Sequence, residues 1–470
     1  MDLFYIGPGM GIGSVILFLL IGGIVLFAFG FIFWIKLKNI FKKKKSIKKV
    51  LLFVSIFILS LFLFSLFGWS VKEIYSKKGK WSKYADIIKP LVEFPDSFTQ
   101  AVDEVNKLPE TFVETPVGFQ SINELSEDLN VLIAYTNQDK ERAIDLVNLK
   151  EDKIIHSWKI KNPYQPHDRI YDPIFFKDTS LCYSFNGVSG ITKIDKNGDT
   201  LWDQNQIIHH HSMNLDSAGN IWACSYIREP KGHIFFKGKY VLGSKEFKFV
   251  DNAIVQLNKV SGEIIFEKYM AEIIKENNLS YLILKSPNID DPFHINDIQP
   301  ALYTTAYYNE GDLFISSRNL SCIFHYRPST NKVLEVISGP FTCQHDVDIT
   351  SDSTLLFFNN NTHVLEPANR WGNPMSKNLN SLGDFNSNLI SYQLKDNSFE
   401  VLLEKEFNEH SIFTSTEGTV EQIDDSTFFV EEQNSSVIWV IQNSNILYKN
   451  VLASPHAGYH HLTNWPKVIK

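Results

Sequence analysis

Charge is missing from two long stretches near the N terminus of this 470-residue chain. Residues 10–35 and 50–71 contain no Asp, Glu, Lys or Arg over 26 and 22 consecutive positions. Each stretch is long enough to cross the hydrocarbon core of a bilayer as a helix. A cleaved signal peptide would place a short apolar stretch behind basic residues, but this chain opens with Asp2 and has no lysine before Lys36. We therefore expect two retained transmembrane helices that bind the lipid bilayer.

Cysteine is also scarce, and the four that occur all lie in the second part of the chain: Cys182, Cys224, Cys322 and Cys343. Four isolated positions do not form a zinc motif, so we expect no metal there. An even number in a globular region is consistent with an oxidising compartment. Our hypothesis is two disulfides, one joining Cys182 to Cys224 and the other joining Cys322 to Cys343, although the sequence does not fix the pairing.

The loop between the two apolar stretches sets the expected orientation in the membrane. Residues 36–49 contain eight lysines, and such loops stay on the cytoplasmic side. Both termini would then lie outside, with the globular domain facing the periplasm or the cell exterior. A looser set of lysines between Lys72 and Lys89 opposes this orientation. The whole chain has a net charge of −8, so contact with lipid headgroups explains the lysine run better than binding to nucleic acid does. We therefore do not expect nucleic acid as a partner.

Composition divides the chain into three parts: a two-helix anchor at 1–71, a spacer at 72–128 and a globular domain at 129–470. The spacer is predicted to be partly helical, because 98–105 and 121–129 have mixed charge without strand alternation. From Asn130 onward, short β-branched and aromatic runs alternate with Asn, Asp, Gly and Ser, which is typical of strands and tight turns.

Four strands with intervening turns recur in the globular domain, in units at about 130–160, 168–203, 209–269, 292–338, 344–406 and 411–449. Six such units, each too small to bury its own apolar face, predict an all-β fold: a six-bladed β-propeller preceded by two transmembrane helices. A sandwich or barrel explains the grouping less well. Insertions at 234–249 and 361–386 are expected as loops over one face, and 459–465 as the closing strand.

Histidines stand at the ends of strands that should be innermost in their blades. Inner strands of a propeller converge on its axis, so His211, His294 and His345 can meet at one channel mouth. Side chains at i and i+2 of a strand share a face, so His294 and Asn296 should point together. By the same rule, His209 and His211 would share a face with His210 opposite, although the sequence does not settle which of the three faces the site.

Three short motifs follow one another in this region: His294-Ile-Asn296, Ser317-Arg318 and Gln344-His345-Asp346. In this order after an earlier histidine strand, they resemble the arylsulfotransferase family of bacterial six-bladed propellers, over roughly residues 130–450. The family usually has His-Asp where this chain has His211-Ser212.

The resemblance implies transfer of a sulfuryl group from an aryl sulfate ester to a phenol, without a nucleotide sulfate donor or other cofactor. His345 would be the nucleophile that becomes sulfated. His294 and Arg318 would bind and polarise the sulfate, Asn296 would support them, and His211 would complete the substrate pocket.

The chemistry of these residue types agrees with those roles. Sulfuryl transfer, like phosphoryl transfer, needs alignment and positive donors around the equatorial oxygens, and the fork of Arg318 matches a tetrahedral oxyanion. A neutral imidazole is a competent nucleophile. Protonated His294 can act as general acid toward the departing phenolate and later take the proton of the acceptor.

Two other classes of function stay open. His211, His294 and His345 could instead bind zinc in a metal enzyme, although Arg318 beside a cation makes this less attractive. The domain could also be a non-catalytic anion-binding sensor that kept the fold. Glu417, Glu421 and Gln422 are further candidates for the pocket, but no local pattern supports them. The sequence identifies neither the donor nor the acceptor.

Overall fold

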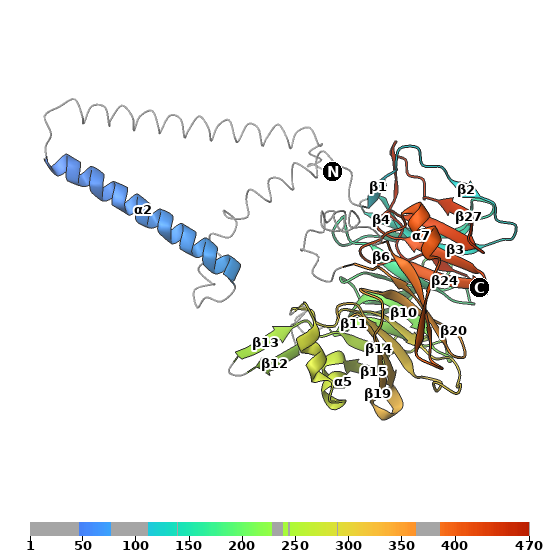
Figure 1. Ribbon diagram of the computed structural model, residues 1–470. Helices are drawn as coiled ribbons and strands as arrows, with labels where there is room; N and C mark the ends of the chain where they lie inside the picture. Colours follow the sequence, from blue (N-terminus) through green and yellow to red (C-terminus); the bar gives the residue numbers. More distant parts are fainter. Residues whose placement is uncertain are drawn as a thin grey trace. The chain divides into compact units, whose positions relative to one another are not determined.

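The computed structural model describes residues 47–76, 111–138, 140–227, 238–242, 245–288, 290–362 and 386–469. The chain divides into two compact units, Met1–Pro109 and Glu110–Lys470. The described element of the first unit is helix α2, Ile47–Ser76 (Figure 1). Every side chain of α2 between Ser55 and Trp69 is exposed, most of them apolar.

Of the two predicted membrane spans, 10–35 lies outside the described residues and 50–71 falls on α2. In the part of the chain that the structure describes, no helix is both long enough and apolar enough to cross a membrane. Residues 98–105 of the predicted spacer also lie outside the described part.

The second unit is a β-propeller of six antiparallel sheets (Figure 1). Each blade is given from its innermost strand outward. The first three blades are β29 (Lys467–Val468), β3 (Asn130–Gln138), β4 (Glu141–Asn148) and β5 (Lys153–Lys161); β6 (Ile170–Phe175), β7 (Leu181–Phe185), β8 (Ile191–Ile194) and β9 (Thr200–Gln204); and β10 (Ile207–Leu215), β11 (Ile221–Ile227), β14 (Ala253–Leu257) and β15 (Ile264–Tyr269).

Three further blades complete the ring. They are β16 (Ile295–Pro300), β17 (Leu313–Ser317), β18 (Cys322–Arg327) and β19 (Lys332–Ile337); β20 (His345–Ser351), β21 (Thr354–Asn359), β22 (Asn388–Gln393) and β23 (Ser398–Leu402); and β24 (Thr419–Asp424), β25 (Thr427–Glu432), β26 (Val437–Gln442), β27 (Asn445–Asn450) and β2 (Ile122–Asn123). These blades confirm the six predicted units.

Shorter elements lie between or beside the blades. They are the hairpin β12 (Gly238–Leu242) and β13 (Lys245–Phe249), the pair β1 (Phe112–Glu114) and β28 (Tyr459–His461), the helices α5 (Met270–Glu276) and α7 (Glu404–His410), and the 3-10 turns η1 (Ser280–Lys285) and η2 (Pro328–Thr330). The hairpin occupies the predicted insertion at 234–249. Most of the insertion at 361–386 lies outside the described residues.

Burial explains why these sequences form blades. Every residue of β17, Leu313–Ser317, is buried, while the outermost strand β19 alternates exposed Lys332 with partly buried Val333. The apolar face that one blade cannot bury alone packs against the next blade. Phe324 of the fourth blade, for example, packs in the same core as Trp222 of the third. Burying one such side chain stabilises the fold by about 1.5–3 kcal/mol.

The chain termini close the ring differently from the prediction. The innermost strand of the first blade is β29, Lys467–Val468, which follows the predicted 459–465 segment; from that segment, Thr463 forms an antiparallel bridge with Tyr135 of β3. Within that segment, β28 pairs with β1 instead. Residues 121–129 are not helical: β2 within them pairs with β27 as a fifth strand of the last blade. The helical prediction is wrong there because a sheet edge supplies the backbone partners.

The four cysteines are buried free thiols, so both predicted disulfides are wrong. Cys182 packs in the core between the second and third blades, and Cys224 packs in the next core along the ring. Equivalent positions in neighbouring repeats therefore lie in different interfaces, which their similar sequence contexts do not reveal. Burial raises the pKa of Cys224 well above its ordinary value.

Backbone-to-side-chain hydrogen bonds link five of the six inner strands in order, from β6 through β10, β16 and β20 to β24. Asp172 accepts the N–H of Met213, Ser212 Oγ accepts that of Ile298 at 3.3 Å, Asp297 accepts that of Val347 at 2.7 Å, and Asp346 accepts that of Val420 at 2.6 Å. Ser212 thus occupies the place that an aspartate takes in three other blades. The serine hydroxyl therefore makes this contact between blades in place of a carboxylate.

Candidate functional site

The predicted site residues lie where the inner strands begin. Adjacent strands are antiparallel, so the segments entering each inner strand and the loops between second and third strands share one face of the propeller. Several residues here have positive φ, among them His211 (61°), His294 (44°), Cys343 (56°), Glu417 (62°) and Trp465 (51°). Such angles are uncommon outside glycine and often occur at functional sites.

The three predicted histidines come together from three blades. The ring centroid of His211 lies 4.9 Å from that of His294 and 6.1 Å from that of His345. His211 and His345 are buried, while the His294 side chain is 28% exposed. The structure therefore places one partly accessible and two enclosed imidazoles at the same end of the channel.

His345 is held in one orientation by its Nδ1 atom. Nδ1 lies 2.6 Å from Asn360 Oδ1 and 3.0 Å from the carbonyl oxygen of Cys343. Because both neighbours are acceptors, Nδ1 carries the proton of the neutral ring and Nε2 carries the lone pair. Burial, and then the charge of Arg318, lower the pKa of His345 to about 3. The ring is therefore neutral near pH 7.

Asn360 connects His345 to the segment that enters the last blade. Its Nδ2 donates to the carbonyl oxygen of Thr414 at 2.9 Å and also to that of Glu417. These bonds fix the amide orientation, so its Oδ1 must face His345. Asn360 is itself fully buried. It follows β21 directly, and no motif in the sequence singles it out.

His294 and Arg318 form the charged side of the site. His294 Nδ1 lies 2.6 Å from Asp291 Oδ2, so this carboxylate orients the ring. The backbone N–H of Arg318 donates to the carbonyl oxygen of His294 at 3.1 Å. Arg318 is 8% exposed, and its Nη1 donates to Asn319 Oδ1 at 3.1 Å.

Asn296 lies in a bulge of β16, between Ile295 and Asp297. Its Nδ2 donates to the backbone carbonyl of Gln344 at 2.7 Å, which joins the strand after His294 to the residue before His345. Its Oδ1 is buried without a hydrogen-bond partner among the described residues. Asn296 therefore fixes the spacing of two site strands.

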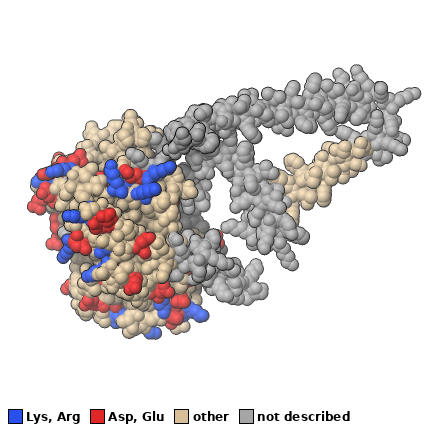
Figure 2. Space-filling model, turned by 180° about the vertical axis from the view of Figure 1, so that it is seen from behind, with Lys and Arg blue, Asp and Glu red and all other residues tan. Residues whose placement is uncertain are grey.

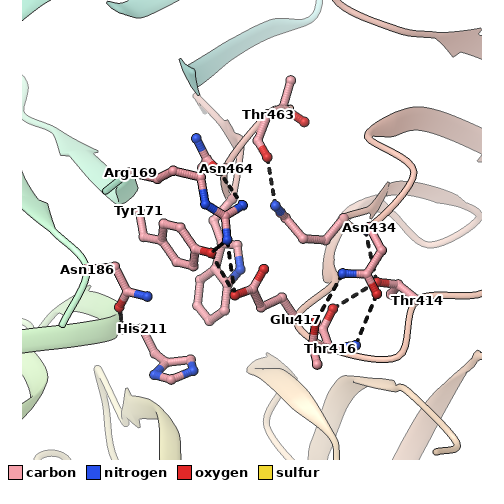
Figure 3. Close-up of polar contacts among 12 residues, drawn as sticks. Arg169, Tyr171, Asn186, His211, Thr414, Thr416, Glu417, Asn434, Thr463 and Asn464 are labelled. Atoms are coloured by element: carbon pink, nitrogen blue, oxygen red, sulfur yellow. Dashed lines mark hydrogen bonds and ion pairs between the residues drawn. The ribbon is translucent and has the colours of Figure 1, made fainter. Parts of the chain in front are cut away.

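The orientation predicted for the triple histidine is wrong. The pairing of β10 with β11 shifts register between His209 and Met213, and His211 has a left-handed backbone whose N–H donates to Asn186 Oδ1 (Figure 3). This bulge breaks the alternation of side chains. His210 lies beside His211, whereas His209 contacts Ser184 and the Ser212 carbonyl inside the fold.

Trp465 reaches the same place from the segment before β29. Its ring centroid lies 5.9 Å from that of His211, 6.1 Å from that of His345 and 6.1 Å from that of Tyr171. Its backbone N–H donates to Glu431, whose pKa burial raises to about 8. Sequence analysis missed Trp465 because the closing segment was expected to supply only a strand.

A second polar group, formed by Arg169, Tyr171 and Glu417, lies near His211 (Figure 3), and its Tyr171 ring contacts that of Trp465. The Tyr171 hydroxyl donates to Glu417 Oε1 at 2.7 Å and accepts from Arg169. Arg169 also donates to Asn464 Oδ1 at 3.0 Å. Glu417 was among the weaker sequence candidates, but Arg169 and Tyr171 were missed. An arginine just before β6 and a tyrosine as its second residue give no pattern that would have revealed them.

Among the described residues, no group of three or more His, Cys, Asp or Glu side chains is arranged to hold a metal ion. The three histidines meet, but His345 and His294 use their Nδ1 atoms on Asn360 and Asp291. The arrangement instead offers one free nucleophilic nitrogen beside a guanidinium and a carboxylate-bound imidazole. That set suits the transfer of a tetrahedral anionic group.

Several solved structures match this chain at low sequence identity. A protein of unknown function from Bacteroides caccae is 10% identical, with 73% of this chain and 100% of that chain covered, at a TM-score of 0.45. A streptogramin B lyase is 13% identical (71% and 87%, TM-score 0.38), and virginiamycin B lyase from Staphylococcus aureus is 12% identical (71% and 89%, TM-score 0.37). These likenesses carry no argument about activity.

No curated protein matches the chain. The family model described as "Arylsulfotransferase (ASST)" matches residues 172–448, which is more than half of the chain. The matched region spans all three motifs and five of the six blades in full or nearly so. The chain belongs to the arylsulfotransferase family.

Proposed function

We propose that this protein transfers a sulfuryl group from an aryl sulfate ester to a phenolic acceptor through sulfated His345, without a nucleotide sulfate donor. The observation that carries this proposal is the orientation of His345. Its Nδ1–H is held by Asn360 and Cys343, so the lone pair of Nε2 is left for attack on sulfur. Burial keeps the ring neutral, which a nitrogen nucleophile requires.

In the first half of the reaction, His345 Nε2 forms a bond to sulfur while the bond from sulfur to the aryl oxygen breaks. Arg318 and His294 are placed to bind the sulfate oxygens, where preorganised donors stabilise developing charge. Protonated His294, oriented by Asp291, gives its Nε2 proton to the leaving aryl oxygen. The products are a phenol and sulfohistidine.

In the second half, the acceptor oxygen attacks sulfur and the bond from sulfur to His345 breaks, which returns the lone pair to Nε2. The acceptor hydroxyl loses its proton to a base in the pocket. The rings of Trp465 and Tyr171 are buried next to each other beside this site, and we place the aryl ring of the acceptor against them. Asn296 acts indirectly, by holding the two histidine strands together.

The intact mass of the purified protein after mixing with an aryl sulfate tests this proposal. We expect a gain of one sulfuryl group, located at residue 345 by peptide mapping, and loss of that gain when a phenol is added. A sulfuryl group located at another residue would identify that residue, and not His345, as the nucleophile. No mass gain and no phenol release would favour a non-catalytic anion-binding propeller.

The pH dependence of the sulfation step follows from the depressed pKa of His345. A group with a pKa of about 3 stays deprotonated on acidification, so lowering the pH from 7.5 to 5.5 should not reduce the single-turnover rate of sulfation. An ordinary histidine with a pKa near 6.5 would lose reactive neutral form about tenfold over that range. Rapid-quench mass measurements, with circular dichroism to confirm folding, distinguish these outcomes.

We also propose that the protein is attached to the cytoplasmic membrane, with the propeller on the periplasmic or outer side. Support comes from the charge-free stretches 10–35 and 50–71 and from the exposed apolar side chains of α2, such as Leu52 and Phe64. In contrast, the propeller surface carries interspersed charges of both signs (Figure 2). Recovery of the full-length protein in the soluble fraction after cell lysis would contradict attachment.

A further inference from the structure

His210 and His211 make direct contact through their rings. The two Nδ1 atoms lie 2.8 Å apart, and the ring planes are nearly perpendicular, at 89°. Successive residues of a regular strand point to opposite faces, so this contact depends on the bulge and the positive φ of His211. Both rings are buried.

The proton between these two nitrogens can be assigned from the surroundings of His210. Its ring stacks on Tyr226 at a centroid distance of 4.2 Å, which fixes the ring plane. The backbone carbonyl of Ser225 favours a proton on this ring, and Nε2 has no hydrogen-bond partner among the described residues. Because Nδ1 is already engaged by His211, we place that proton on Nε2. Nδ1 of His210 is then the acceptor.

We infer that His210 is a positioning residue that holds His211 with its proton on Nδ1, so that Nε2 of His211 is the base for the acceptor hydroxyl. This inference rests on the proposed function, because it assigns the base of the second half-reaction. It resembles the way in which a buried acceptor fixes the tautomer of a catalytic histidine elsewhere. Here the acceptor is a neutral imidazole.

The surroundings of His211 suit a base. Burial, and then the nearby His294, His210 and His345 rings, lower the pKa of His211 well below its ordinary value. The resting ring is therefore neutral, with an Nε2 lone pair free to take a proton. Its centroid lies 4.9 Å from that of His294 and 5.9 Å from that of Trp465, between the acid of the first step and the aromatic wall.

The proton balance closes over one cycle. His294 gives one proton to the leaving aryl oxygen, and His211 Nε2 takes one from the acceptor hydroxyl as the new bond from oxygen to sulfur forms. The proton then passes from His211 to His294 through solvent, which restores the starting state. His210 gains and loses no proton. Removing it should therefore affect the second half-reaction and spare the first.

Two replacements of His210 separate positioning from packing. His210→Asn places an amide oxygen where Nδ1 was, and His210→Phe keeps an aromatic ring against Tyr226 but offers no acceptor. We expect His210→Phe to slow discharge of sulfated His345 by phenol by about 10–100-fold, a usual cost of losing such a supporting contact. His210→Asn should stay within about fivefold of wild type, and sulfation should change less than about threefold in both.

The tautomer of His211 is measured separately, by nitrogen NMR of full-length protein labelled with ¹⁵N-histidine, with a His211→Asn sample for assignment. We expect a proton on Nδ1 in wild type and His210→Asn, and its loss or exchange between nitrogens in His210→Phe. A proton on Nε2 in wild type would overturn the inference. So would equal losses in both half-reactions, or in both variants, because these indicate packing alone.

The two proposals fail in distinguishable ways. If wild type forms no sulfohistidine, the proposed function is wrong, and the NMR result still decides whether His210 sets the tautomer of His211. If sulfohistidine forms but its discharge is unaffected in His210→Phe, the function stands and the role of His210 is wrong.

Discussion

Replacing His345 with alanine is expected to lower the rate of sulfuryl transfer by about 10⁴-fold or more. The reason is that Nε2 of this ring is the atom proposed to bond to sulfur, and alanine offers no substitute. A loss of this size corresponds to about 5.5 kcal/mol of activation free energy. The measurement is phenol release from an aryl sulfate in the presence of an acceptor phenol, together with the intact mass.

Two further variants make that result specific. His156→Ala removes a histidine from the outermost strand of the first blade, where its Nε2 contacts the Lys196 carbonyl, and should leave turnover unchanged. Asn360→Leu should cost about 10–100-fold, because it removes the oxygen that holds Nδ1 of His345. If His345→Ala retained more than about one part in a hundred of the activity, direct transfer between the two substrates would replace the covalent scheme.

The propeller was predictable because the sequence pattern that specifies it is local and recurs in every blade. Each blade needs four short strands with turns between them, and the sequence shows this pattern from Asn130 to Asn450. Closure of the ring was less predictable. The two residues of β29, Lys467 and Val468, are too few to show any alternation, and their pairing with β3 depends on chain ends that meet only in the folded state.

The site was predictable where a motif marks it and not where the backbone departs from regular geometry. His294, Arg318 and His345 were found because their neighbours in sequence form a recognisable set. The prediction that His210 and His211 point to opposite faces was wrong, because a bulge with a left-handed histidine changes which side chains share a face. Histidine carries no sequence signal for such a bulge, whereas glycine or asparagine would.

Residues that support the site from other blades were also beyond sequence analysis. Asn360 follows an ordinary strand, and Trp465 lies near the C terminus, yet both are within reach of His345. Their roles depend on the angle between blades and on closure of the ring. In a propeller, strands far apart in sequence share the axis, so the immediate supports of a catalytic residue come from several repeats.

Lys467 is the residue for which we expect the largest effect on stability. Its Nζ lies 2.7 Å from Asp172 Oδ1 and donates to the carbonyl oxygen of Met213 at 2.9 Å, so the closing strand is bound to the second and third blades. Asp172 is 1% exposed. Lys467→Met would leave this carboxyl buried without its cation, and such losses cost about 3–5 kcal/mol. Urea unfolding followed by circular dichroism measures the change.

The sign of the pH dependence follows from Asp172. Burial raises the pKa of Asp172 even with Lys467 present, and removing the lysine raises that pKa further. An acid whose pKa is higher in the folded than in the unfolded state loses stability as pH rises between the two values. The deficit of Lys467→Met should therefore be larger at pH 8 than at pH 5.

The double variant Lys467→Met, Asp172→Asn separates the ion pair from simple packing. It removes both charges, so no unpaired carboxyl is left, and it should recover most of the stability that Lys467→Met loses. The amide introduced by Asp172→Asn can turn its oxygen toward the N–H of Met213 and keep the contact between the second and third blades. If the double variant were as unstable as the single one, and the deficit were equal at pH 5 and pH 8, the lysine would act through its aliphatic stem alone.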